Sequence, residues 1–271
     1  MFPLNTEIFP ATAAELERLL NESLHQLFDL ARQPVELREK AYPHLDSLSI
    51  SLDGAGLRQQ PPAIPTLNTK PTPALTVDSF RAGGSGMSVG PAAIDFLLDA
   101  RALQLHQATD RQGHIVLLLQ NAAEGHVQIS AALSDLEALI AEVLKSEAGK
   151  HGVNVDNVRL SLRSRSPRSL AAEVLLRAKK LFLSASLRIT GQLELDEELN
   201  ARISGLDCTG EGAMASVACG VLKPHLHTLD GREFSLMSLP LGEVRLRDVR
   251  IAVGDKLAIT AEFGSIHEQV V

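Results

Sequence analysis

A serine between two glycines is the first candidate for chemistry in this sequence. Ser88 lies in a G-x-S-x-G pattern that runs from Gly86 to Gly90, and this is the pattern of the nucleophile elbow in α/β-hydrolases. The elbow requires a buried apolar strand before the serine and a helix after it. Here glycines and Arg81 precede the pattern, while Pro91 and an alternating segment follow it. We therefore expect a flexible glycine loop here and no catalytic serine.

Two other clusters resemble fragments of metal or acid–base sites. His225 and His227 form an H-x-H pair with Cys219 upstream, but zinc sites use three or four protein ligands and no second cluster stands nearby. Asp196 begins a run of three acids at a predicted turn, whereas acid–base work needs carboxylates in a cleft with separated pKa values. No phosphate loop occurs. We expect no catalytic residues, no metal and no cofactor, and a protein that is not an enzyme.

Basic residues concentrate between positions 150 and 190. This segment holds nine Lys and Arg residues against two acids, although the net charge of the whole chain is −7. Alternation places five of them on the face opposite the apolar one, across a single hairpin: Arg159, Arg163, Arg165, Arg177 and Lys179. Such a face would attract anionic headgroups or another acidic surface, at about 1 kcal/mol per basic residue near a charged membrane. The alternative is an ordinary solvated sheet face.

Composition bounds the class of protein. Apolar residues make up 45% of the 271 residues, which excludes disorder throughout, and aliphatic side chains must form the core because Trp is absent and aromatics are few. The net negative charge disfavours a nucleic-acid binder, and no apolar stretch is long enough to span a bilayer. The first twenty residues lack the features of a signal peptide, so we expect a cytoplasmic protein, or a periplasmic one only if the chain is trimmed.

Two cysteines are too few for a scaffold that depends on disulfides. Cys208 and Cys219 could pair in an oxidising compartment, and otherwise they are two buried thiols.

Hydrophobic periodicity predicts three helices, at about 13–33, 135–148 and 212–222. Thr12 with Glu15 and Ser134 with Glu137 each fit a capping box at a helix start. Alternating segments predict strands, among them 158–162, 174–178 and 181–189, and Gly254-Asp255 joins two such segments as a hairpin.

These elements predict an α+β fold, in which a highly curved, barrel-like antiparallel sheet wraps around long amphipathic helices. We expect an N-terminal helix and strand in residues 1–58, a proline-rich connector in 59–75 and the curved sheet with its helices in 76–271, all in one integrated fold.

From about Ser134 to Gly264 the order of features resembles the LmeA-like family of bacterial lipid-binding proteins, related to the tubular lipid-binding (TULIP) superfamily. The segments that carry the resemblance are SDLEALIAEVLKSEAGKHG, VNVDNVRLSL, LSASLRITGQLELDEEL and FSLMSLPLGEVRLRDVRIAVGDKLAITAEFG. The resemblance implies a curved antiparallel sheet around long helices, with a hydrophobic groove for phospholipid acyl chains. The chain departs from this family in lacking an export signal and in having residues 1–75.

The expected function is non-enzymatic binding of a lipid or another hydrophobic small molecule in an apolar groove, with possible peripheral contact with an anionic membrane and no nucleic-acid partner. An aliphatic lining accepts acyl chains and offers few polar groups for selectivity. The predicted lining residues are Leu20, Leu24, Leu27, Leu136, Leu139, Ile140, Val143, Leu160, Leu162, Val174, Leu176, Leu183 and Leu187. The alternative is a structural or scaffolding protein with a fully packed core that recruits a protein partner.

Overall fold

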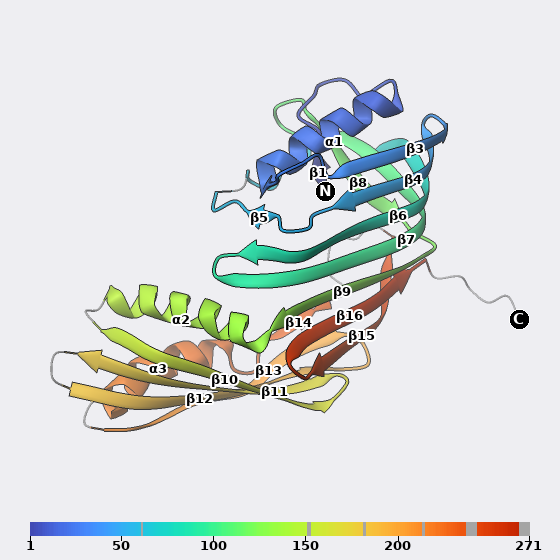
Figure 1. The fold of residues 1–271 in the computed structure, drawn as a ribbon. Coiled ribbons are helices and arrows are strands. Elements are labelled where there is room, and N and C mark those ends of the chain that lie inside the picture. Colours follow the sequence, from blue (N-terminus) through green and yellow to red (C-terminus); the bar gives the residue numbers. More distant parts are fainter. Residues whose placement is uncertain (61, 151–152, 181–182, 213–214, 237–242, 266–271) are drawn as a thin grey trace, which may run out of the picture.

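The residues that the structure describes fold into two β-sheets and three helices (Figure 1). The computed structural model describes residues 1–60, 62–150, 153–180, 183–212, 215–236 and 243–265. Strands hold 58% of the described residues and helices 18%. The predicted α+β fold, with a barrel-like sheet wrapped around long helices, is therefore wrong: the sheets dominate, the helices are short, and in the described residues neither sheet closes.

Sheet 1 has eleven strands, with the order β15–β16–β9–β7–β6–β4–β3 along its main path. These seven strands are β3 (Val35–Ala41), β4 (His44–Ser51), β6 (Thr72–Val89), β7 (Ala92–Thr109), β9 (Glu124–Ala132), β15 (Arg245–Val253) and β16 (Lys256–Gly264). Four short strands branch from the path: β1 (Phe2–Pro3), β2 (Phe28–Asp29), β5 (Gly56–Leu57) and β8 (Ile115–Asn121). The pairs are antiparallel except that β4 and β5 run parallel to β6.

Sheet 2 is a five-stranded antiparallel sheet whose strands follow one another in sequence order. Its strands are β10 (Asn154–Ser166), β11 (Ser169–Lys180), β12 (Leu183–Leu195), β13 (Asn200–Glu211) and β14 (Glu233–Ser235). The predicted turn at Ser166–Ser169 is confirmed as the β10–β11 connection.

The helices lie on the sheets and are not enclosed by them. Helix α1 (Ala13–Leu27) packs in the curve of sheet 1, while α2 (Leu133–Gly149) and α3 (Ala215–Leu229) lie on sheet 2 (Figure 1). The predicted cap of α1 is confirmed, because Thr12 Oγ1 accepts a hydrogen bond from the Glu15 amide. The helix ends at Leu27 instead of continuing to residue 33, because Phe28 and Asp29 extend to pair with β5.

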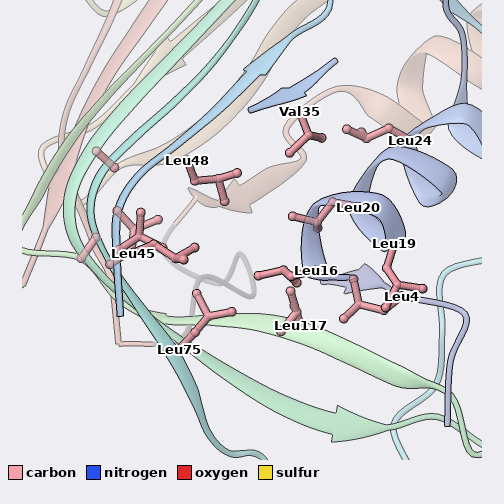
Figure 2. Packing of buried hydrophobic residues seen from close by; sticks show 14 of the residues in the cluster. Leu4, Leu16, Leu19, Leu20, Leu24, Val35, Leu45, Leu48, Leu75 and Leu117 are labelled. Atoms are coloured by element: carbon pink, nitrogen blue, oxygen red, sulfur yellow. The ribbon is translucent and has the colours of Figure 1, made fainter. Parts of the chain in front are cut away.

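Leucines of α1 fill the curve of sheet 1 (Figure 2). Leu16 is fully buried, and Leu20 and Leu24 are each 4% exposed. Leu24 points toward Val35 of sheet 1, and Leu16 lies next to Leu117 of the same sheet (Figure 2). This end of the molecule therefore has a dense aliphatic core.

The long strand β7 changes its pairing partner part-way along its length. Its first half pairs with β9 from Ile94 to Arg101, and its second half pairs with β8 from Gln104 to Thr109. Ala102, between the halves, has a φ of 48°, in the left-handed region that residues with a Cβ seldom adopt. The change of partner splits the sheet into two branches around α1, and the path ends at separate edges, β3 and β15. Closure would need these edges to pair.

Two further local predictions are wrong. The glycine stretch around Ser88 is part of strand β6 and not a flexible loop, with an irregularity in its pairing to β7 between Gly84 and Met87. Helix α2 has no capping side chain, because Ala132 at its start still pairs in β9. The Glu137 carboxylate instead accepts a hydrogen bond from the Leu160 amide, at 2.7 Å.

The two sheets meet at the β10–β11 turn. The Ile251 amide of β15 donates to the Pro167 carbonyl at 2.6 Å, and Arg168 pairs with Asp248 at 3.1 Å. Beneath these contacts, side chains of β15 and β16 pack against side chains of sheet 2 in one apolar cluster. The packed faces of the two sheets, called their inner faces below, are therefore turned toward one another.

Candidate functional site

A row of large apolar side chains crosses the inner face of sheet 1. Phe96 of β7 is paired with Ile129 of β9, and Ile129 is also paired with Ile259 of β16. On the next strand, Ile259 is paired with Ile251 of β15. Directly paired residues of neighbouring strands share one face of a sheet. The pairing therefore builds a continuous apolar row from segments that are far apart in the sequence. We call Phe96, Ile129 and Ile259 the inner row.

Exposure increases along this line of side chains. Ile251 is 4% exposed because sheet 2 packs over it, whereas Ile259 is 39% exposed and Ile129 is 44% exposed. The cover supplied by sheet 2 thus ends between β15 and β16. Single exposed apolar residues are common on protein surfaces, whereas contiguous exposed apolar residues are a feature of binding sites.

Helix α2 supplies a second apolar surface beside the inner row. It begins where β9 ends, and it also approaches β7. Leu144 and Ala148 pack into the core of sheet 2, while helical geometry turns the stripe of Leu136, Leu139 and Val143 away from that core. Leu136 and Leu139 remain half-buried and Val143 is 55% exposed.

The structure does not bring the thirteen predicted lining residues together. Leu20 and Leu24 lie in the filled core under α1, with Leu27 half-buried at the end of that helix. Leu176 and Leu187 are buried between sheet 2 and its helices. The others are half-buried or exposed on α2 (Leu136, Leu139, Ile140, Val143) or half-buried on the inner face of sheet 2 (Leu160, Leu162, Val174). The side chain of Leu183 lies outside the described residues.

The five predicted basic residues share one exposed surface, the outer face of sheet 2. The register of β10 and β11 places Arg159 and Arg163 on the same side as Arg177 and Lys179. Arg165 joins them by donating a hydrogen bond to Gln192 at 2.8 Å. All five side chains are exposed.

Counter-charges on this surface are few. Lys179 donates a hydrogen bond to Asp156 at 2.8 Å, which lowers the pKa of that carboxyl. Arg188 of β12 lies 3.9 Å from Glu173. Among the described residues, Arg159 and Arg177 have no ion-pair partner. The surface therefore keeps unneutralised guanidinium groups.

A polar depression with a volume of about 360 Å³ lies on the outer face of sheet 1. The Asp53 carboxylate accepts hydrogen bonds from the amide and hydroxyl of Ser85, and these bonds lower its pKa. Asp95 accepts from Lys256 and from the Gly86 amide, and these bonds lower the pKa of Asp95 in the same way. Both carboxylates are thus already satisfied by protein groups.

Within the part of the chain that the structure describes, the remaining sequence motifs are not assembled into reactive sites. Ser88 precedes a turn into strand β7, so the helix that a nucleophile elbow requires is replaced by a strand. Cys219 is bonded to Cys208 in a disulfide, and the side chain of His225 lies outside the described residues. The described residues contain no cluster of three or more His, Cys, Asp or Glu side chains that could hold a metal ion.

No family model, curated protein or solved structure matches this chain. Within the described residues, no helix has both the length and the apolar character needed to cross a membrane.

The inner row was missed by sequence reasoning although its signal was present. Alternation predicts a strand around each of Phe96, Ile129 and Ile259. It does not indicate which strands pair, and only pairing brings the three side chains into one row.

Proposed function

We propose that this protein binds the acyl chain of a lipid, or a similar amphiphile, non-covalently along the inner row. The observation that supports this function is the row itself: Ile129 and Ile259 are adjacent, aligned by the sheet register and more than a third exposed. Covering such surface by a hydrocarbon chain is favourable by about 25 cal/mol per Å².

The surroundings of the row favour a chain over a compact ligand. The apolar stripe of α2, which includes Leu139 and Val143, flanks an open surface and not an enclosed cavity. An extended hydrocarbon can contact several residues along a row and needs no directional partner.

The test is binding of a fluorescent fatty acid by the purified protein. We expect saturable binding to the unmodified chain and a decrease in affinity of at least tenfold for I129D/I259D, because carboxylates would replace the apolar contacts. I64D is the matched control, since Ile64 is 82% exposed in the proline-rich segment. Mass spectrometry of organic extracts should also detect a co-purified lipid. The proposal fails if the probe binds neither protein or if I64D weakens binding equally.

A scaffolding role is favoured by one observation, the filled core under α1. It would use the same exposed row as a protein-binding surface. Stoichiometric capture of a protein partner that I129D/I259D abolishes, together with no binding of the fatty acid, would support scaffolding over lipid binding.

A further inference from the structure

A cavity with a volume of about 580 Å³ opens on the outer face of sheet 2. Its charged and hydroxyl lining residues are Arg159, Arg177, Arg188, Ser186, Thr209 and Glu211. We call this cavity the arginine depression. Three guanidinium groups thus share one cavity with a single carboxylate.

The sheet register explains how the arginines gather. Arg159 is opposite Leu175, and Leu175 is opposite Arg188, so the two arginines flank one leucine from either side. Arg177 is two residues from Leu175 on the same strand and therefore on the same face. Neighbouring strands are about 4.8 Å apart, so the Cα atoms of Arg159 and Arg188 are separated by about 10 Å. Arginine side chains are long enough to converge across that span.

A bulge in β10 completes the arrangement. Between Asp156 and Arg159 the register shifts by one residue, and Asn157 has a φ of 52°. The extra residue keeps both side chains on the outer face, although they are three positions apart. Asp156 contributes no side chain to the cavity lining: it is opposite Arg177 in the register and pairs with Lys179 at 2.8 Å.

The chemistry of the lining fits a phosphate group. Guanidinium groups donate two parallel hydrogen bonds to phosphate oxygens, and the hydroxyls of Ser186 and Thr209 are further donors in the same cavity. Glu211 is the one carboxylate in the lining and Glu173 lies 3.9 Å from Arg188, so Arg159 and Arg177 supply the positive charge that remains. Leu175 forms an apolar part of the lining and offers no competing acceptor side chain.

We propose that the arginine depression binds a phosphate ester, supplied either by the headgroup of an anionic lipid or by a soluble phosphate compound. This site goes beyond the proposed acyl-binding function, because it lies on the outer face of sheet 2 and the inner row lies on the inner face of sheet 1. Phosphate binding can therefore succeed or fail in an experiment independently of acyl-chain binding.

The experiment uses the full chain and two probes. Glycerol 1-phosphate is titrated by calorimetry, and phosphatidylcholine vesicles with and without phosphatidic acid are tested by cosedimentation. R159Q/R177Q is the test variant and R188Q is a milder second variant. R38Q/R111Q is the control, because it removes the same charge from exposed arginines outside the depression. Circular dichroism verifies that each variant is folded.

The outcomes separate the two sources of phosphate. Binding of glycerol 1-phosphate that weakens at least tenfold in R159Q/R177Q supports the proposal and identifies a soluble ester as sufficient. Binding only to vesicles that contain phosphatidic acid, lost in R159Q/R177Q and kept in R38Q/R111Q, supports it and identifies a lipid headgroup. An equal loss in R38Q/R111Q, or no binding of either probe, overturns the proposal.

Discussion

Gly125 of β9 allows the ring of Phe263 to lie across the strand. The two residues are opposite one another in the register of β9 and β16, and a Cβ built at Gly125 would overlap the Phe263 ring. An aromatic ring over a cross-strand glycine shields the exposed backbone and helps fix the register. Phe263 is consequently 8% exposed, at the boundary between the α1 core and the inner row.

We expect Gly125→Ala to lower the free energy of unfolding by about 1–3 kcal/mol, because the ring must move from a well-packed position. Gly220→Ala in α3 is the control with the opposite sign. The space around Gly220 is open, and alanine stabilises a helix interior by about 0.5–1 kcal/mol relative to glycine. Urea denaturation measures both variants, and an unchanged midpoint for Gly125→Ala would contradict the packing argument.

Asp248 of β15 in sheet 1 forms an ion pair with Arg168 in the β10–β11 turn of sheet 2. Hydrogen bonds from Arg168 and then Arg250 lower the pKa of Asp248. A carboxyl whose pKa is lower in the folded state stabilises the fold above its unfolded pKa of about 3.9, and loses this effect as the pH falls through the folded pKa.

Asp248→Asn should therefore destabilise the protein by about 1 kcal/mol at pH 7, a value reduced by the partial exposure of the pair. The difference from the unmodified protein should begin to shrink below about pH 4, where the unfolded carboxyl becomes protonated, and should vanish once the pH is below the lowered folded pKa. Urea denaturation at pH 7 and pH 3 tests this, with the exposed Asp46→Asn as control. A difference that is independent of pH would mean that charge at Asp248 does not matter.

At the scale of elements, the disulfide ties α3 to sheet 2. Cys208 of β13 and Cys219 of α3 are separated by eleven residues, and both are buried among the side chains between helix and sheet. α3 contains Pro224, which removes a helical hydrogen bond. The helix therefore depends strongly on its attachment to β13.

Reduction should lower the free energy of unfolding by about 2–3 kcal/mol, because a cross-link closing a loop of this length restricts the unfolded chain by that amount. The measurement is urea denaturation with and without dithiothreitol. In the double variant Cys208→Ala/Cys219→Ala, the free energy of unfolding should be the same with and without dithiothreitol. A response equal to that of the unmodified protein would show that the reductant acts elsewhere.

The first residue of a helix could be predicted only where it depends on residues close together in the sequence. The Thr12 cap of α1 depends on residues three positions apart, and it is confirmed. Ser134 offers the same local pattern, but the pairing of Ala132 in β9 and the use of Glu137 by Leu160 override it. The alternation of Val158, Leu160 and Leu162 with arginines also placed the basic face correctly. The bulge at Asn157 was not predicted, because no local sequence pattern around it indicated an extra residue in the strand.

At the scale of the whole molecule, the missing information was which strands pair. Residues near 96, 129 and 259 meet only because β9 inserts between β7 and β16, and no local pattern encodes that order. The predicted barrel around long helices assumed that all the strands belong to one continuous, unbranched sheet. The change of partner at Ala102 instead opens the sheet into branches, and each group of helices receives its own core.

Sheet 2 has opposite chemistry on its two sides, with arginines outward and leucines inward. A molecule resting on a bilayer through its arginines would place sheet 2 between that bilayer and the inner face of sheet 1. A fatty chain would then have to leave its membrane completely before loading. The rate of uptake would then be limited by desorption of the lipid from the bilayer into water. The protein would not insert into the bilayer to extract the lipid.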